Sequence, residues 1–497
     1  MFKLSFFKRN FVEINSFLIL IITSAFLRFP QLGYSHFYGD ETKTLFLRKD
    51  ISLKDFLLNQ RKGPIQFLVS WGAENIFGNF DEAYIRLPYA LAGFLAVIVF
   101  YFLVKTLFNF KVASISAFLF SFNGFFIAFS RTAQYQSFLL LFGFLSILFV
   151  LMYIKNYKYS RFWLFLSAVF LAFSYLAHYD ALFYDFVVGL ILLFYLLKNP
   201  NKLKEVVLLY VPVFLAIVSS FYIPYLLKGY FSDYTSNYLL RRVSGKDYAT
   251  NSSLYTYLVY NPLYFSLVPL SFSVIAFVHK FDWRLKTVFL WFLLPFILFE
   301  LVFSNPGTHI LNYFPPLFIL ASVGMVTVIE VAFGYLKWGF VAFTITIFVL
   351  IFGVSYNVYL PLLNTGYPWK STHVLGYKVD RIKKNDYHLF LYGFPYYRSW
   401  DKVSAYFEEN GLPRSFYTDD NQTIGEYYIY GPPYYPLNPS QMPAHIVQVS
   451  FNQEFRLIPT EVLNSYVLEQ QFVDNSGNPL ATIYKQKKEE VTTNVTE

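Results

Sequence analysis

The sequence predicts a polytopic α-helical membrane protein with about eleven membrane-spanning helices, followed by a small α/β domain. Three observations predict this fold class. Of the 497 residues, 56% are hydrophobic and only 14% are charged, whereas soluble domains carry roughly 25% charged residues. Apolar windows long enough to cross about 30 Å of hydrocarbon recur over most of the chain. Beyond residue 360, charged residues, Pro and Asn return.

The apolar windows define the expected spans in chain order. We expect eleven, and up to thirteen, and the eleven fall at residues 13–29, 83–104, 112–130, 133–153, 162–178, 181–197, 206–226, 254–278, 287–303, 310–331 and 339–360. A basic stretch precedes the first window, but no small-residue cleavage site follows it, so we expect this helix to be retained as an anchor. Residues 63–77, GPIQFLVSWGAENIF, are short and amphipathic, which predicts a helix at the membrane interface.

Basic residues predict the orientation of these spans. If the N-terminus is cytoplasmic, every second loop faces the cytoplasm, and all of these loops are basic, as the positive-inside rule requires. Their cations are Lys105 and Lys111; Lys155, Lys158 and Arg161; Lys198, Lys202 and Lys204; Lys280, Arg284 and Lys286; and Lys337. We therefore expect a multi-pass protein of the plasma membrane, with the first loop (about residues 30–82) and the C-terminal domain on the extracytoplasmic side.

Charge and cysteine content exclude several classes of function. The net charge is +9, which in a soluble chain would suggest nucleic acid. Here the cations lie mostly in short loops between spans, so they indicate topology, and we expect no nucleic-acid partner. The chain has no cysteine, which excludes disulfides, thiolate catalysis and Cys-ligated metals.

The chain changes character after the last span, which divides it into residues 1–361, the transmembrane domain, and residues 362–485, an α/β domain. Short runs typical of strands are HLFLYGF, EYYIYG and HIVQVSF. SWDKVSAYFEENG predicts a helix that Ser399 caps and Gly411 closes. The remaining residues, 486–497, are polar and predict a disordered tail.

Polar residues gather at the ends of the spans on the expected outer side. Asp40 and Glu41 stand side by side after the first span. A single charge at a span end is usually a snorkelling anchor. Cations around one carboxylate pair, however, suit an anionic ligand at the membrane surface together with a general base. The pair alone lacks the further oxygen ligands that a divalent cation needs. The other polar residues are Lys62, Arg86, Arg131, Gln134, His178, Asp180, Arg241, Arg242 and His309.

Three segments of the N-terminal part resemble one family, the GT-C glycosyltransferases related to protein O-mannosyltransferases and bacterial aminoarabinose transferases. LRFPQLGYSHFYGDETKTL is similar to the family's first outer loop, because Arg28 and Leu32 fit its Arg-x-x-x-Leu and Asp40 and Glu41 fit its Asp-Glu pair. KGPIQFLV resembles its Lys-Pro-Pro-Leu segment, with Gly63 in place of a proline. FGNFDEAYIRLPYALAGFLAVIVFYFLVKTLF is similar to the start of its next span.

Three further segments extend the resemblance over residues 12–330. FIAFSRTAQYQSFLLLF resembles the family's Ser-Arg-Glu-Ala-Arg-x-Tyr, with Thr132 and Gln134 replacing Glu and Arg. NYLLRRVSGKDY is similar to a loop that supplies a phosphate-contacting arginine, best matched by Arg242. NPGTHILNYFPPLFILASVG resembles a late-span motif, with His309 where aminoarabinose transferases carry Tyr.

The resemblance implies the GT-C fold and an inverting transferase that needs no metal or other cofactor. The donor would be a polyprenyl-phosphate sugar in the bilayer, and the acceptor a hydroxyl group on a protein, lipid or glycan outside. Asp40 would deprotonate the acceptor, and Glu41 would orient Asp40 or bind a substrate hydroxyl. The residues implied to bind the donor phosphate or substrate are Lys62, Arg86, Arg131, His178, Arg242 and His309.

Two other functions remain open from the sequence. An oligosaccharyltransferase or ligase would move a preassembled glycan, and the former would need a metal and acidic pairs in two outer loops, of which one good pair is present. A transporter of lipid-linked sugars would be expected to show repeats and polar residues at mid-bilayer, whereas the charges here collect at one surface. The donor sugar, the acceptor and the oligomeric state do not follow from the sequence.

Overall fold

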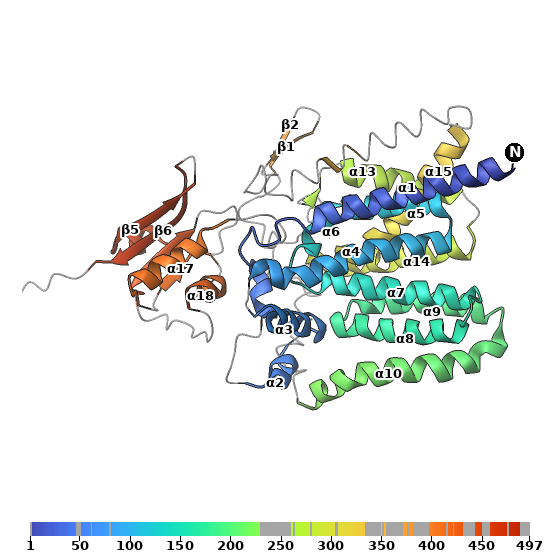
Figure 1. Cartoon of the computed structure of the whole chain (residues 1–497), viewed down its shortest axis with the longest axis horizontal. Coiled ribbons are helices and arrows are strands. Elements are labelled where there is room, and N and C mark those ends of the chain that lie inside the picture. The colour runs from blue at the N-terminus through green and yellow to red at the C-terminus, as the bar shows by residue number, and fades with distance from the viewer. Residues whose placement is uncertain are drawn as a thin grey trace, which may run out of the picture.

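The computed structural model of the chain describes residues 2–45, 51–60, 62–78, 81–228, 260–261, 264–278, 281–303, 307–332, 349, 352–353, 371–374, 377–380, 397–413, 416–420, 422–430, 443–449, 458–474 and 477–487. Long helices form a bundle, and the C-terminal sheet with its helices lies beyond one end of it (Figure 1). We call this end of the bundle the site end. Helix α1 (Phe2–Arg28) begins at the opposite, far end and runs toward the site end.

The bundle confirms the prediction of a polytopic helical protein. Among the described residues, seven helices are long and apolar enough to cross a membrane, and eight if the bent pair α5–α6 counts as one span. Each predicted window up to residue 331 coincides with at least part of a helix. The window 339–360 lies almost wholly outside the described residues, so the total of eleven stays a prediction. Besides α1, the described helices that coincide with the predicted windows are α4 (Glu82–Leu107), α5 (Phe110–Phe122), α6 (Gly124–Ser130), α7 (Gln136–Ile154), α8 (Ser160–Ala177), α9 (Ala181–Leu196), α10 (Leu203–Leu227), α13 (Tyr264–Ile275), α14 (Trp283–Ile297) and α15 (Phe314–Ala332).

Polar caps set where several of these helices start. Asp81 Oδ1 accepts a hydrogen bond from Ala83 N at 2.8 Å and begins α4, and Asp282 begins α14 in the same way. Such a cap satisfies backbone N–H groups that have no partner within the helix. Asn123 caps α6 at the 64° bend that separates it from α5, and this bend delivers the following loop, with Arg131, to the site end.

Side-chain size and exposure separate the inner and outer faces of the bundle. On α4, Ala92 and Ala96 are at most 2% exposed, and small residues of this kind let helices approach closely. On α10, Leu208, Leu215 and Ile223 are more than half exposed. Apolar side chains in such numbers on a surface indicate contact with hydrocarbon. The structure is therefore that of a multi-pass membrane protein.

Basic loop residues gather at the far end of the bundle. Lys155 donates to the carbonyl of Thr106, and Arg284 Nη1 donates to the carbonyl of Leu107 at 3.3 Å. These contacts bring together loops that the positive-inside rule assigns to one side. The carboxylate pair lies at the opposite end, as the alternation of the loops predicts.

The C-terminal domain contains a four-stranded sheet in the order β3-β4-β6-β5. Strands β3 (Phe416–Thr418) and β4 (His445–Val449) are parallel, whereas β6 (Pro479–Gln486) is antiparallel to both β4 and β5 (Tyr466–Val473). A separate hairpin joins β1 (Ser371–Val374) to β2 (Tyr377–Asp380). The prediction of a strand in HIVQVSF is confirmed, and HLFLYGF lies outside the described residues.

Two details of this domain differ from the prediction. The first five residues of EYYIYG, Glu426–Tyr430, form part of helix α18 (Gln422–Tyr430), not a strand, and the Gly lies outside the described residues. Helix α17 (Trp400–Glu409) confirms the helix predicted in SWDKVSAYFEENG, and Gly411 follows it with φ +57°. Ser399, however, makes no side-chain cap, because its own φ of +58° directs the hydroxyl elsewhere.

Candidate active site

The first loop at the site end presents Asp40 to solvent. Asp40 lies in the 3-10 helix η1 (Gly39–Thr44), which α2 (Leu53–Leu58) and α3 (Ile65–Phe77) follow. Its side chain is 31% exposed, with Oδ1 2.6 Å from Lys43 Nζ and Oδ2 3.9 Å from Lys62 Nζ. A partly exposed carboxylate beside two ammonium groups is placed where a general base could meet an acceptor.

Glu41, its neighbour, points the other way and is 2% exposed. Its Oε1 accepts hydrogen bonds from Arg86 Nε and Ala133 N, both at 2.9 Å. Its Oε2 accepts from Tyr38 N at 2.9 Å and Arg86 Nη2 at 2.8 Å. With four donors from the chain itself, this carboxylate has no capacity left for a substrate hydroxyl. The geometry favours the orienting role and argues against the hydroxyl-binding one.

Two of the arginines expected to bind substrate are instead buried among backbone carbonyls. Besides Glu41, Arg86 donates to the carbonyl groups of Leu32, Ser35 and His36, at 2.6–3.0 Å. Arg131 donates to the carbonyl groups of Arg28, Pro30 and Gln31, at 2.9–3.3 Å. Both are less than 10% exposed. In the structure these two arginines hold the first loop against α4 and α6, and their expected role in substrate binding stays a prediction.

Lys62 is placed by a close contact between two backbones. A Cβ on the adjacent Gly63 would lie 2.0 Å from the carbonyl oxygen of Leu176, at the end of α8. Only glycine allows this approach, which brings Lys62 next to the loop between α8 and α9. Lys62 Nζ lies 4.9 Å from the centre of the Tyr135 ring, a cation–π geometry, and its side chain is 26% exposed.

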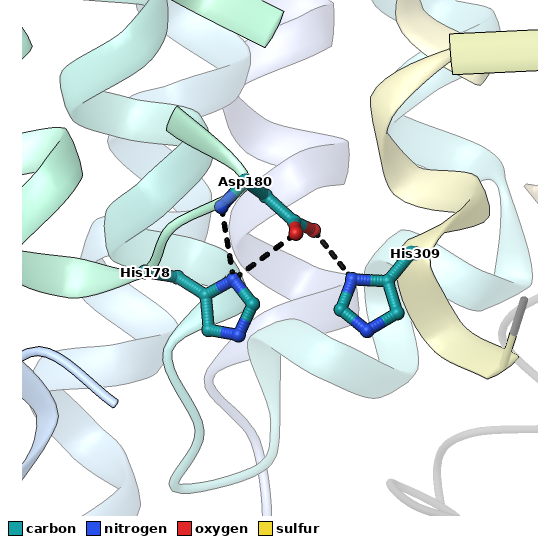
Figure 2. A group of neighbouring side chains, drawn as sticks. All are labelled: His178, Asp180 and His309. Carbon is teal, nitrogen blue, oxygen red and sulfur yellow. Dashed lines mark hydrogen bonds and ion pairs between the residues drawn. The ribbon is translucent and has the colours of Figure 1, made fainter. Parts of the chain in front are cut away.

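Three buried polar residues complete the site end beside Lys62: His178 after α8, Asp180 before α9 and His309 in the 3-10 helix η5 (Gly307–Asn312) (Figure 2). His309 Nδ1 lies 2.7 Å from Asp180 Oδ2, and Asn312 Nδ2 donates to the same oxygen at 2.8 Å. His178 Nδ1 accepts from Asp180 N at 3.2 Å. The His178 ring stacks on Tyr135, with centroids 3.8 Å apart.

The protonation states in this group follow from burial and charge. Burial lowers the pKa of His178 to about 4, although the Asp180 charge opposes this, so His178 is neutral at neutral pH. Burial alone would raise the pKa of Asp180, but His309 and then His178 hold it well below its usual range. Since an ionised carboxylate only accepts hydrogen bonds, Asp180 fixes the tautomer of His309 with its proton on Nδ1.

The C-terminal domain is bonded to the first loop, just before Asp40. Arg398, which is 1% exposed, donates to the carbonyl of Phe37 at 2.6 Å and to Asp420 Oδ2 at 2.8 Å. Phe37 N donates to the Tyr428 hydroxyl at 2.6 Å, and that hydroxyl donates to Glu82. These contacts fix the residues that lead into η1.

The structure brings together only part of the predicted set. Asp40, Lys62, His178 and His309 meet at the site end, whereas Arg241 and Arg242 lie outside the described residues. Gln134 is buried, and its Oε1 accepts a hydrogen bond from Gln136. Sequence reasoning missed three contributors, Asn312, Arg398 and Tyr428. The sequence gives a weak signal for Asn312, because it lies three residues after His309 in THILN and so on the same side of a helical turn. It gives no signal for Arg398 or Tyr428.

Comparisons with known proteins agree with this architecture. The sequence model of a family described as dolichyl-phosphate-mannose-protein mannosyltransferase matches residues 61–224, less than half of the chain. No curated protein matches the sequence. The archaeal oligosaccharyltransferase AglB from Archaeoglobus fulgidus, in complex with an inhibitory peptide and a dolichol-phosphate, is 12% identical over 86% of this chain and 62% of its own, with a TM-score of 0.51.

Two further solved structures are similar over a smaller share of the chain. ArnT from Cupriavidus metallidurans bound to undecaprenyl phosphate is 17% identical, with a TM-score of 0.48, and covers 62% of this chain and 60% of its own. The Pmt1-Pmt2 complex of S. cerevisiae, a protein O-mannosyltransferase bound to the sugar donor, is 17% identical, with a TM-score of 0.35, over 45% of this chain and 34% of its own. The chain thus spans about 60% of the length of the first two structures that it matches.

The helical bundle with a long first loop and a C-terminal domain at the same end is the GT-C fold. Together with the family match, this fold points to the GT-C glycosyltransferase superfamily. The resemblance that the sequence motifs indicate is confirmed at this level.

Proposed function

We propose that the chain transfers a sugar from a polyprenyl-phosphate donor to an acceptor hydroxyl group, with Asp40 as the general base. The observation that carries the proposal is the contrast between Asp40, 31% exposed with Lys62 beside it, and Glu41, whose two oxygens are filled by the chain itself. The AglB structure, which has the same fold, holds a dolichol-phosphate and a peptide, and the matching family model describes a dolichyl-phosphate-mannose donor.

The proposed reaction is a single inverting displacement. The acceptor oxygen forms a bond to the anomeric carbon while its proton passes to an Asp40 oxygen. The bond between the anomeric carbon and the phosphate oxygen breaks, and its electron pair stays on the lipid phosphate. A phosphate is a good leaving group, so positive charge beside it contributes more than an added acid. Lys62 supplies that charge within reach of Asp40, and Arg242 is expected to supply more.

We further propose that the site end faces the outside of the plasma membrane. The basic loops at the far end support this, because positive loops stay cytoplasmic. Since the chain has no native cysteine, single cysteines can be placed near Asp40 and Lys158 and labelled in intact cells and in inverted vesicles. The two positions must label from opposite sides, and labelling from the same side contradicts the orientation.

Asp40→Asn tests the chemistry directly. This variant keeps the shape of the side chain but cannot take a proton, so transfer of label from a polyprenyl-phosphate sugar should fall by about 10²–10⁴-fold, while donor binding remains. Lys62→Gln should instead weaken donor binding by ~10–100-fold, the equivalent of one charge-assisted hydrogen bond. Lys54→Gln is the matched control, because Lys54 is an exposed lysine of α2 in the same loop. Near wild-type turnover by Asp40→Asn would overturn the assignment.

A preassembled glycan is the alternative donor group, and the AglB likeness favours it over a transporter. The two enzymes differ in what leaves the lipid. Mass spectrometry of the acceptor after one turnover distinguishes a single sugar from an oligosaccharide, and the proposal requires a single sugar.

A further inference from the structure

Three buried side chains at the site end have the chemistry and spacing of a metal site. His178, Asp180 and His309 come from two separate parts of the chain, and all are at least 95% buried. Each offers one ligand atom, and these atoms lie within 4.8 Å of one another. Figure 2 shows the two imidazole rings on either side of the carboxylate. The three converge because the α8–α9 loop and η5 end at the same level of the bundle.

The three ligand atoms, two imidazole nitrogens and one carboxylate oxygen, indicate which kind of cation the site would bind. Two imidazoles and one carboxylate are typical of zinc sites that keep a fourth position open, whereas magnesium and calcium prefer oxygen ligands alone. Ligands of a tetrahedral zinc ion at about 2.0–2.2 Å lie roughly 3.3 Å apart. In the structure, His178 Nδ1 is 3.2 Å from Asp180 Oδ1, and His309 Nδ1 is 2.7 Å from Asp180 Oδ2. Small side-chain shifts would therefore admit the ion. It would take the place of the proton on His309 Nδ1 and of the hydrogen bond from Asp180 N to His178 Nδ1, because a ligand nitrogen must offer its lone pair to the metal.

The residues around the three ligands hold them in place, as the surroundings of metal ligands usually do. Asn312 Nδ2 donates both to Asp180 Oδ2, at 2.8 Å, and to the carbonyl of His309, at 3.0 Å. The Oδ1 atom of Asn312 is buried and has no hydrogen-bond partner among the described residues. Tyr135 stacks on the His178 ring, and Phe299 lies nearly parallel to the His309 ring, at 5.6 Å.

We propose that His178, Asp180 and His309 bind one zinc-like divalent cation whose open position takes a phosphate oxygen of the lipid donor. This second part rests on the proposed function, whereas binding of the metal does not. Lys62 supports it, because its ammonium group and the His178 ring contact the same Tyr135 ring. Cation and lysine together would form the phosphate site. The inference differs from the expectation of a metal-free mechanism, which the family resemblance implies.

Metal titration of the full-length chain in detergent tests the proposal. The protein, carrying no histidine tag, is stripped with a chelator and titrated with Zn²⁺, Co²⁺ and Mg²⁺. We expect one Zn²⁺ or Co²⁺ per chain, the d–d absorption of four-coordinate Co²⁺, and no comparable Mg²⁺ binding. Asp180→Asn and His309→Gln should each weaken Zn²⁺ binding by at least ~100-fold. Loss of a residue that only supports a metal ligand typically costs ~10–100-fold, so a larger loss indicates a ligand. His445→Gln is the matched control, because His445 lies in β4 of the C-terminal sheet, where its Nε2 is 3.1 Å from Glu469 Oε2.

The outcomes separate this inference from the proposed function. If wild type binds no Zn²⁺, or if Asp180→Asn binds it as wild type does, the three residues form only a hydrogen-bonded group and the metal site is wrong. Wild type needs no substitution to fold, so the first result stands even if the variants are unstable. Zn²⁺ should tighten binding of undecaprenyl phosphate by at least tenfold; an unchanged affinity overturns the link to phosphate. Asp40→Asn should bind Zn²⁺ like wild type, so failure of the general base leaves this titration unaffected.

Discussion

Replacing Glu41 by Gln separates the role of the buried carboxylate from that of Asp40. Each oxygen of Glu41 accepts two hydrogen bonds, one of them from Arg86. An amide has one oxygen and one NH2 group, so in either orientation the NH2 group faces two donors. Two bonds are then lost, and the Arg86 charge, 3% exposed, loses its ionic partner.

The structure supports an estimate of the cost. Removing one partner of a buried ion pair costs about 3–5 kcal/mol. The loss of two hydrogen bonds to a charged group, at ~1.5–3 kcal/mol each, gives about 3–6 kcal/mol, a range that overlaps the first. We therefore expect Glu41→Gln to lower the free energy of unfolding by ~3–5 kcal/mol. Asp40→Asn breaks only partly exposed pairs and should lower it by ~0–1 kcal/mol, although it removes turnover.

The assay is equilibrium unfolding of both purified variants in mixed micelles, followed by tryptophan fluorescence and circular dichroism. A double variant that also carries Arg86→Met should lose less than the sum of the two single losses, because it removes both charges of one pair. If Glu41→Gln unfolds at the wild-type midpoint, or if Asp40→Asn is equally destabilised, the division of roles between the two carboxylates is wrong.

Two further predictions concern the segments that hold the site. Gly63→Ala should destabilise the chain and weaken donor binding, because its Cβ would meet the Leu176 carbonyl. Gly72→Ala is the control and should be neutral or stabilising, because a Cβ there would have no atom within 4 Å among the described residues. Equal thermal stability of the two variants would contradict the prediction. Burial lowers the pKa of His36. The Arg398 charge lowers this pKa further, whereas Asp401 and Glu82 raise it by less than burial lowers it. The unfolded state therefore binds this proton more readily, and docking of the C-terminal domain should weaken as the pH falls below about 6.5. Hydrogen exchange of the backbone amides of residues 36–45 measures the docking, after correction for the intrinsic pH dependence of exchange. If the corrected rate is the same above and below pH 6.5, the prediction is wrong.

Hydropathy was sufficient to predict the helices, because burial in hydrocarbon depends on local composition. The positions of Asp40 and Glu41 at one end of the bundle followed from the same reasoning. What the sequence could not predict is which of the two is buried, since this depends on Arg86, which lies 45 residues further along the chain. The same contact directs the Arg86 guanidinium toward Glu41 and the first loop.

The error in EYYIYG has a similar origin. Aromatic and β-branched residues favour strands, but this preference depends strongly on context. In the structure, Gly425 packs closely against Trp400, and Ile424 is fully buried. A helix can bury both residues on the one face that it turns toward the rest of the domain. The His178–Asp180–His309 group likewise required the fold, because the topology placed these residues on one side without showing that they are neighbours.

The proposed division of roles explains why the two carboxylates are adjacent in one turn. Successive residues of a 3-10 helix differ in direction by about 120°, so Glu41 can point into the bundle while Asp40 points out. The inward residue is bonded to α4 through Arg86, and the preceding backbone is held by Arg398 of the C-terminal domain. Asp40 is therefore held by its neighbours while its side chain stays 31% exposed, the combination that the proposed base requires.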